Sequence, residues 1–258
     1  MKGNIMNTKN SCIRKSMFPL LLGMLIFFIG CSVPQIKLPS ALSTDTSMYT
    51  VKGRYGFSWN KVITYGEYKT SKFSKGWTTT ESNSSDVLQM KSAKQKFNFI
   101  QFTPDGTQAE VVCAGQFEES DVNVLNDFFS IGLSYKNYFY GSVLLDKGMN
   151  IWNFVVNNPD NISPNKLDMG EAKNDQGEVI KIKGILQVEG HNLPKIFQGS
   201  VYGYEFVYQG NTIGAVSTIN AGAVWIKNGI SDDLKVVLAG MSTSLLVRDD
   251  LEEQSSNE

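Results

Sequence analysis

The stretch SDDLKVVLAGMSTSLLV, residues 231–247, decides the fold because it is too apolar for a surface helix. Ser231 is a good helix N-cap, and Asp232 and Asp233 place negative charge at the positive end of the helix dipole. A helix that is hydrophobic all round must be buried on all sides. At about 1.5 Å per residue it reaches roughly 24 Å, short of the roughly 30 Å hydrocarbon core of a bilayer. We therefore predict a helix buried in a protein core over 231–248.

Strand-like sequence precedes this helix along most of the chain. Aromatic and β-branched residues alternate with polar ones and are punctuated by turn residues. The clearest hairpin surrounds Pro104-Asp105-Gly106, where proline presets one turn dihedral and glycine supplies a positive φ. Periodicity also favours a short amphipathic helix over 120–129 and an irregular connection over 157–177. We count roughly nine to twelve strands, spaced as in an antiparallel barrel or sandwich.

An apolar helix that follows many strands predicts a mainly β fold, a closed antiparallel barrel of about twelve strands wrapped around the helix. The alternative is a β-sandwich with the helix packed on one face. The stretch YEFVYQGNTIGAVSTINAGAVWIKNGISDDLKVVLAGMSTSLLV, 204–247, resembles the closing pattern of the tubby-like superfamily, which includes LURP-one-related proteins and phospholipid scramblases. The resemblance implies a twelve-stranded barrel around a helix and no particular activity. The basic pocket with which tubby domains bind phosphoinositides has no counterpart that can be matched by position.

The beginning of the chain has the pattern of an export signal. Four basic residues precede the apolar run MFPLLLGMLIFFIG, 17–30, which is too short for a comfortable transmembrane helix. We therefore expect residues 1–30 to be a signal peptide.

The sequence FIGCSVP, 28–34, resembles the lipobox of bacterial lipoproteins, although Phe28 and Ile29 depart from its commonest residues. The resemblance implies a diacylglycerol on the sulfur of Cys31, cleavage after Gly30, and acylation of the new amino terminus with a fatty acid such as palmitate. Ser32 as the second mature residue favours the outer membrane, in a periplasmic or surface-facing position. A plain secreted protein is the alternative.

Removal of the signal leaves a domain with one internal thiol and a modest negative charge. Cys12 leaves with the signal and Cys31 takes the lipid, so Cys113 cannot form an internal disulfide. The signal holds four basic and no acidic residues, so 24 − 4 = 20 cations remain against 25 anions, a net charge of −5. This balance argues against nucleic acid as a partner.

Composition divides the mature chain into three parts. Residues 31–47 are rich in proline, serine and threonine, which indicates a lipidated tether. Residues 48–248 form the single β-rich domain, and residues 249–258 are expected to be an acidic disordered tail.

Candidate catalytic and binding groups are few, and each has a structural explanation. His191 lies among turn formers, and Cys113 in VVCAG is expected to pack as a small hydrophobe rather than pair with it. One histidine and one thiol leave only oxygen ligands for a metal, and the acidic group Asp168, Glu171, Asp175 and Glu178 does not have calcium-loop spacing. We expect no catalytic set, metal or cofactor.

A cluster of basic residues is the one feature of the sequence that indicates binding to lipid headgroups. Lys91, Lys94 and Lys96 beside Phe97 and Phe99 have the character of a surface for anionic headgroups. Lysines that protect a sheet edge explain the same pattern. The sequence thus favours a non-enzymatic envelope lipoprotein that binds a lipid, glycan or protein. The alternatives are a hydrolase that uses the acidic group and a structural or assembly lipoprotein.

Overall fold

The computed structural model describes residues 35–54, 59–76, 95–115, 128–130, 138–157, 167–190 and 200–255, all within the unit Pro34–Glu258. Side chains are described as far as Arg248. The signal peptide and the lipobox around Cys31 lie outside these residues, as does most of the helix expected over 120–129.

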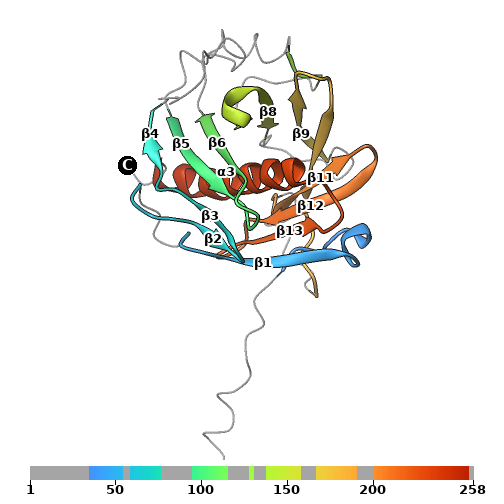
Figure 1. Ribbon diagram of the computed structural model, residues 1–258. Helices are drawn as coiled ribbons and strands as arrows, with labels where there is room; N and C mark the ends of the chain where they lie inside the picture. The colour runs from blue at the N-terminus through green and yellow to red at the C-terminus, as the bar shows by residue number, and fades with distance from the viewer. Residues whose placement is uncertain are drawn as a thin grey trace, which may run out of the picture. The chain divides into compact units, whose positions relative to one another are not determined.

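The described strands form one antiparallel sheet that closes into a barrel (Figure 1). Neighbours in the sheet are neighbours in sequence, β13 pairs with β1, and the pairing of β3 with β5 completes a ring of twelve strands. The short β4 adds a thirteenth strand on β5 beside β3. The strands are β1 (Thr46–Lys52), β2 (Thr64–Tyr65), β3 (Tyr68–Thr70), β4 (Ser74–Lys75), β5 (Gln95–Phe102), β6 (Gln108–Gly115), β7 (Tyr138–Leu145), β8 (Asn150–Asn157), β9 (Asp168–Asn174), β10 (Val179–Ile185), β11 (Gly203–Tyr208), β12 (Asn211–Ser217) and β13 (Ala223–Lys227). The predicted barrel is confirmed, and the sandwich is excluded.

The helix α3 (Asp232–Ser255) fills the barrel (Figure 1). Its side chains from Val236 to Val247 are fully buried apart from the glycine, and they pack against both the β5–β7 wall and the β12–β13 wall. Ser231 caps it as predicted, since its hydroxyl accepts a hydrogen bond of 3.3 Å from the Leu234 amide. Helical backbone continues past Arg248 to Ser255, into the segment expected to be a disordered tail.

Glycines allow the helix to approach the wall closely. A Cβ on Gly240 would lie 3.0 Å from a Val111 methyl and 3.2 Å from a Val143 methyl. On the opposite wall, a Cβ on Gly214 would lie 3.1 Å from a Leu238 methyl. The helix is therefore packed against both sides of the barrel without space for larger residues.

Polar groups inside the barrel join the helix to the strands. The hydroxyl of Tyr65 donates to the carbonyl of Ala239 at 3.0 Å and lies 3.1 Å from the hydroxyl of Thr243. The thiol of Cys113 donates to the hydroxyl of Ser244 at 3.2 Å, and that hydroxyl donates to the carbonyl of Gly240. These bonds fix the rotation of the helix because buried polar groups need partners.

An N-terminal strap, Gln35–Leu42, packs on the outside of the barrel. It ends in the 3-10 helix η2 (Ser40–Leu42). Ile36 and Leu42 are buried and form a cluster with Ala215, Ala223 and Trp225 on the outer faces of β12 and β13. From Gln35 onward, the segment that was expected to be part of a tether over 31–47 is packed on the barrel. The reason is that its two apolar side chains, Ile36 and Leu42, bury themselves against a hydrophobic surface.

The connection expected to be irregular over 157–177 contains a strand. Residues Asp168–Asn174 form β9, which pairs with β8 and β10. Its sequence DMGEAKN has weak strand propensity, but two neighbouring strands supply hydrogen bonds to both of its edges. The 3-10 helix η3 (Asp146–Gly148) forms the turn between β7 and β8.

Candidate binding surface at the loop end of the barrel

The strand order gives the barrel two different ends. Because consecutive strands are antiparallel neighbours, successive connections lie at alternate ends of the barrel. At one end, here called the turn end, the connections between strands hold two to five residues: 66–67, 103–107, 146–149, 175–178 and 209–210. At the other, the loop end, five of the six connections are ten residues or longer: 53–63, 76–94, 116–137, 158–167, 186–202 and, the short one, 218–222.

The turn end is strongly acidic. Its turns, the residues before β1 and the start of α3 carry eight carboxylates: Asp45, Glu67, Asp105, Asp146, Asp175, Glu178, Asp232 and Asp233. The same segments contain two basic residues, Lys147 and Lys235. All eight carboxylates are exposed except that of Glu178, which is half-buried. The end therefore presents a concentrated negative field to its surroundings.

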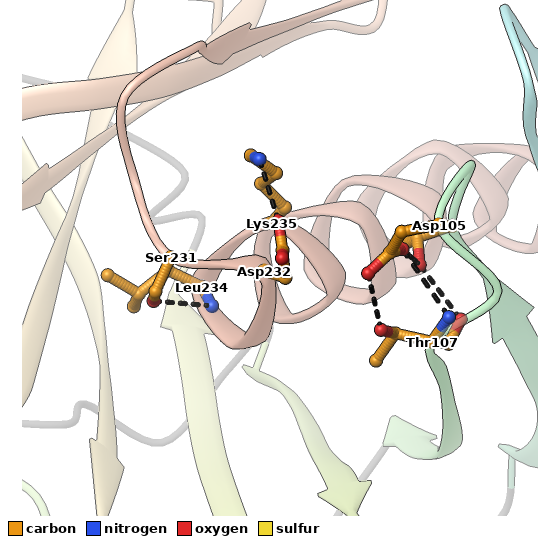
Figure 2. Close-up of polar contacts among 7 residues, drawn as sticks. Asp105, Thr107, Ser231, Asp232, Leu234 and Lys235 are labelled. Carbon is orange, nitrogen blue, oxygen red and sulfur yellow. Dashed lines mark hydrogen bonds and ion pairs between the residues drawn. The ribbon is translucent and has the colours of Figure 1, made fainter.

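Local hydrogen bonds hold the carboxylate of Asp105 ionised. Figure 2 shows it beside Thr107, whose hydroxyl donates at 2.6 Å; the hydroxyl of Thr103 also donates to it. These bonds lower the pKa of Asp105. The start of α3 lies at the same end, where Lys235 pairs with Asp232 at 2.8 Å (Figure 2). Burial, assisted by Tyr49 and by the charges of Asp105 and Asp232, raises the pKa of Tyr68 to about 12.

The loop end carries the opposite bias among its described residues. Four basic residues lie in the strap, the connections and β4 at this end, namely Lys37, Arg54, Lys61 and Lys75, against the carboxylates of Glu189 and of Asp168 at the start of β9. The ammonium of Lys75 lies 5.1 Å from the centre of the Trp59 ring. The remaining residues of these connections carry both signs in the sequence. A rigid barrel that presents long loops at one end is a common arrangement for a binding site.

The two aromatic residues of the predicted basic cluster do not lie on the surface beside its lysines. Phe97 and Phe99 are 1% and 2% exposed and point into the barrel, where they belong to the core around α3. Lys96 alternates with them and lies on the outer wall of β5. Lys91 and Lys94 lie outside the described residues, in the connection that enters β5 from the loop end.

The four acidic residues considered for catalysis do not come together. Asp168 begins β9 near the loop end and Asp175 follows β9 at the turn end, roughly 20 Å apart at about 3.3 Å per residue. Glu171 accepts a hydrogen bond from the Ser130 amide and lies 3.7 Å from the ammonium of Lys173. Glu178 accepts from the amide of Asn174 and the hydroxyl of Tyr208. The carboxylates of Glu171 and Glu178 therefore each have hydrogen-bond partners in their own surroundings and do not face each other across a site.

The thiol of Cys113 faces the interior of the barrel. It is fully buried, and burial raises its pKa well above the ordinary value despite the opposing effect of its hydrogen bond to Ser244. A neutral, inaccessible thiol is not a nucleophile. His191, the other member of the pair considered from sequence, lies outside the described residues, as do Gly30 and Cys31.

A buried polar triad on the outer wall was not foreseen from the sequence. The hydroxyls of Tyr140 and Ser142 both donate to the side-chain carbonyl of Asn153 at 2.6 Å. A phenol and an amide are too weakly basic to activate a serine, so these contacts join β7 to β8 rather than form a catalytic set.

The two ends could have been found from the sequence with a correct strand count. Acidic residues recur in alternate connections, and in an antiparallel barrel alternate connections share an end. The assignment of β9 to a loop removed one strand and with it the alternation.

The described residues contain no group of three or more histidine, cysteine, aspartate or glutamate side chains that could hold a metal ion. In the same part of the chain, no helix is both long enough and apolar enough to cross a membrane. Comparison of the chain with protein-family models, with curated proteins and with solved structures gave no match.

Proposed function

We propose that this protein is a lipoprotein of a bacterial cell envelope whose barrel is a non-enzymatic module that binds a lipid, glycan or protein at the membrane surface. Acyl chains on Cys31 anchor it, in the outer membrane, facing the periplasm or the cell surface. The lipobox-like sequence FIGCSVP and the signal before it support the anchor.

One structural observation carries the binding role: the long connections gather at a single end of a rigid barrel. The interior of the barrel is filled by α3, so a ligand has no space there. The turn end has only short connections. The loop end is therefore the surface on which a partner binds.

The arrangement of the barrel also supports membership in the tubby-like superfamily. The twelve-stranded barrel and the helix that it encloses are what that resemblance implies. The proposal takes from it the architecture alone.

Acylation is tested first. We expect radiolabelled palmitate to be incorporated in a bacterial host and the label to be lost in C31S. A labelled C31S protein, or an unlabelled natural chain in a host that acylates a control lipoprotein, would contradict the anchor.

Binding is tested in intact envelopes with photo-crosslinking residues at two matched glutamines. Gln187 is exposed at the loop end and Gln176 is exposed at the turn end, with β10 between them. We expect a discrete crosslinked lipid, glycan or protein from position 187 and none from position 176. Crosslinks from position 176 alone, or equal yields from both, would overturn the proposed binding end. The absence of any crosslink would favour a purely structural lipoprotein.

A further inference from the structure

The outside of the barrel is covered on some strands and open on others. The strap covers β12 and β13, where Ile36 and Leu42 form a buried cluster with Trp225. The outward side chains of β7 and β8, such as Tyr140 and Asn153, are also buried. Those of β1, β2, β3 and β5 are instead exposed or half-buried. This face, together with the outward residues that flank β2 and β3, is here called the open wall.

Strand pairing sets a row of side chains across the open wall. Lys52 on β1 lies opposite Thr64 on β2, Thr64 lies opposite Lys69 on β3, and Lys69 lies opposite Phe102 on β5. Neighbouring strands are about 4.8 Å apart, so the two lysines are about 10 Å apart along this row. The ammonium of Lys69 lies 5.6 Å from the centre of the half-buried Phe102 ring. The row therefore combines two cations with an aromatic ring.

The open wall is basic although the chain as a whole carries a small negative charge. In the part of it that the structure describes, the outward side chains include no carboxylate and four lysines: Lys52, Lys69, Lys72 and Lys96. The adjoining carboxylates lie beyond its borders, at the turn end and on β6: Asp45, Glu67, Asp105 and Glu110. The outward face of β10 and β11, by comparison, mixes both signs, with Lys183 opposite Glu205. The open wall therefore attracts anionic groups.

Exposed aliphatic side chains are interspersed with these lysines. Three of the five large hydrophobic side chains that are exposed in the described part of the chain lie on the open wall: Met48, Val62 and Ile100, at 47%, 39% and 38%. A single exposed hydrophobic residue needs no explanation, but a group on one face marks an interaction site. The barrel is closed, so lysines are not needed here to protect a sheet edge.

The mixture of cations and aliphatic groups indicates the chemistry of the partner. A glycan could pair with the lysines but would leave the aliphatic side chains without apolar partners. Surfaces that bind a bilayer usually present tryptophan or tyrosine, and the outward positions described on the open wall have neither. A protein segment with carboxylates and apolar side chains matches both kinds of group.

We propose that the open wall docks an acidic, partly apolar segment of a partner protein. The lysines attract the carboxylates of this segment, and Met48, Val62 and Ile100 contact its apolar side chains. The contact is separate from binding at the loop end, because it uses the side of the barrel.

The partner class is tested with three probes and the unanchored C31S chain at low ionic strength. The probes are a glutamate–tyrosine copolymer, polyglutamate and phosphatidylglycerol vesicles. We expect the copolymer to bind more tightly than polyglutamate, and binding of both to weaken as salt is added. Failure to bind the copolymer would overturn the proposal, and binding to the vesicles alone would assign the wall to a membrane instead.

The lysines are tested with two double variants of equal charge. K69Q/K72Q should weaken copolymer binding by about tenfold, since two exposed ion pairs are lost. The matched variant K181Q/K183Q, with both lysines on β10, should change it by less than about threefold. Equal losses in the two variants, or unchanged binding in K69Q/K72Q, would contradict the location of the contact.

The aliphatic side chains are tested through the preference for the copolymer over polyglutamate. M48S/I100S should reduce this preference by about fivefold, because it removes apolar area from the contact. The control M149S changes the most exposed of these hydrophobic side chains, at the turn end, and should leave the preference unchanged. An equal effect of M149S, or none of M48S/I100S, would refute the apolar contribution.

Discussion

The hydroxyl of Thr243 on the central helix donates a hydrogen bond of 2.8 Å to the side-chain carbonyl of Gln101 on β5. Both residues are fully buried. The amide of Gln101 is held in turn by the carbonyls of Lys69 and Phe102 at 3.2 Å. The helix is thus hydrogen-bonded to the part of the wall where β3 and β5 close the barrel.

The T243V substitution should lower the free energy of unfolding by about 2 kcal/mol, because it leaves the Gln101 carbonyl buried without its donor. The control T243S keeps the hydroxyl and loses a methyl group, so about 1 kcal/mol at most is expected. Urea denaturation measures both. Equal stability of T243V and the natural chain would show that this bond does not hold the helix.

Alanine substitutions of two nearby serines on the helix should change the free energy of unfolding in opposite directions. The hydroxyl of Ser242 is buried without a hydrogen-bond partner in the described part of the chain, whereas that of Ser244 bonds Cys113 and Gly240. We expect S242A to raise the unfolding free energy by about 1 kcal/mol and S244A to lower it by a similar amount. Thermal denaturation gives the signs, and a destabilised S242A would mean that its hydroxyl is satisfied.

A methyl group at position 141 should be poorly tolerated. A Cβ on Gly141 would lie 2.3 Å from the Phe154 ring, which is fully buried inside the barrel and cannot move away. We expect G141A to cost about 1–3 kcal/mol. The matched control is G229A, where the nearest atom lies 3.9 Å away, and it should remain within about 0.5 kcal/mol. Denaturant midpoints that coincide for the two variants would contradict the packing.

Alkaline pH should destabilise the fold through its buried acids. Burial raises the pKa of the Cys113 thiol and of the Tyr65 hydroxyl, so both stay neutral in the folded state while the unfolded chain ionises. Stability is therefore full below about pH 8.5 and falls as pH rises, by at most about 1.4 kcal/mol per pH unit for each group. As the pH rises, ionisation of the thiol in the unfolded chain lowers the stability first, and ionisation of Tyr65 and Tyr68 lowers it further above about pH 10.

The variant C113A isolates the contribution of the thiol. Its unfolding free energy should change less between about pH 8.5 and 10 than that of the natural chain, whatever its absolute stability. Chemical denaturation across this range measures the slope. Parallel slopes in the two proteins would refute the role of the thiol.

The central helix could be predicted because its sequence leaves one solution: a cap, an acidic first turn and apolar residues on every side. Strands with alternating sequence, such as Gln95–Phe102, were also predictable. The same alternation shows that Phe97 and Lys96 lie on opposite faces, which separates the aromatic half of the basic cluster from its charges. β9 was not predictable, because its seven residues owe their extended conformation to partners on both sides.

The candidate surface was harder to predict than the fold. Its described lysines are spread over the strap, β4 and the connection between β1 and β2, and only the closed strand order brings them to one end. The strap was missed because Ile36 and Leu42 are isolated apolar residues in a polar segment, and their partner Trp225 is distant in sequence.

The position of α3 after every strand has a consequence for how the chain reaches its folded state. The helix that forms the core of the barrel is synthesised after all the strands. β1 pairs with β2 and β13, and it cannot pair with β13 until most of the chain has been made. Contacts between such distant parts of a chain form slowly. A partly synthesised chain therefore has the strands of the wall but lacks the helix that fills the interior, and the barrel cannot close around its core until α3 has been made.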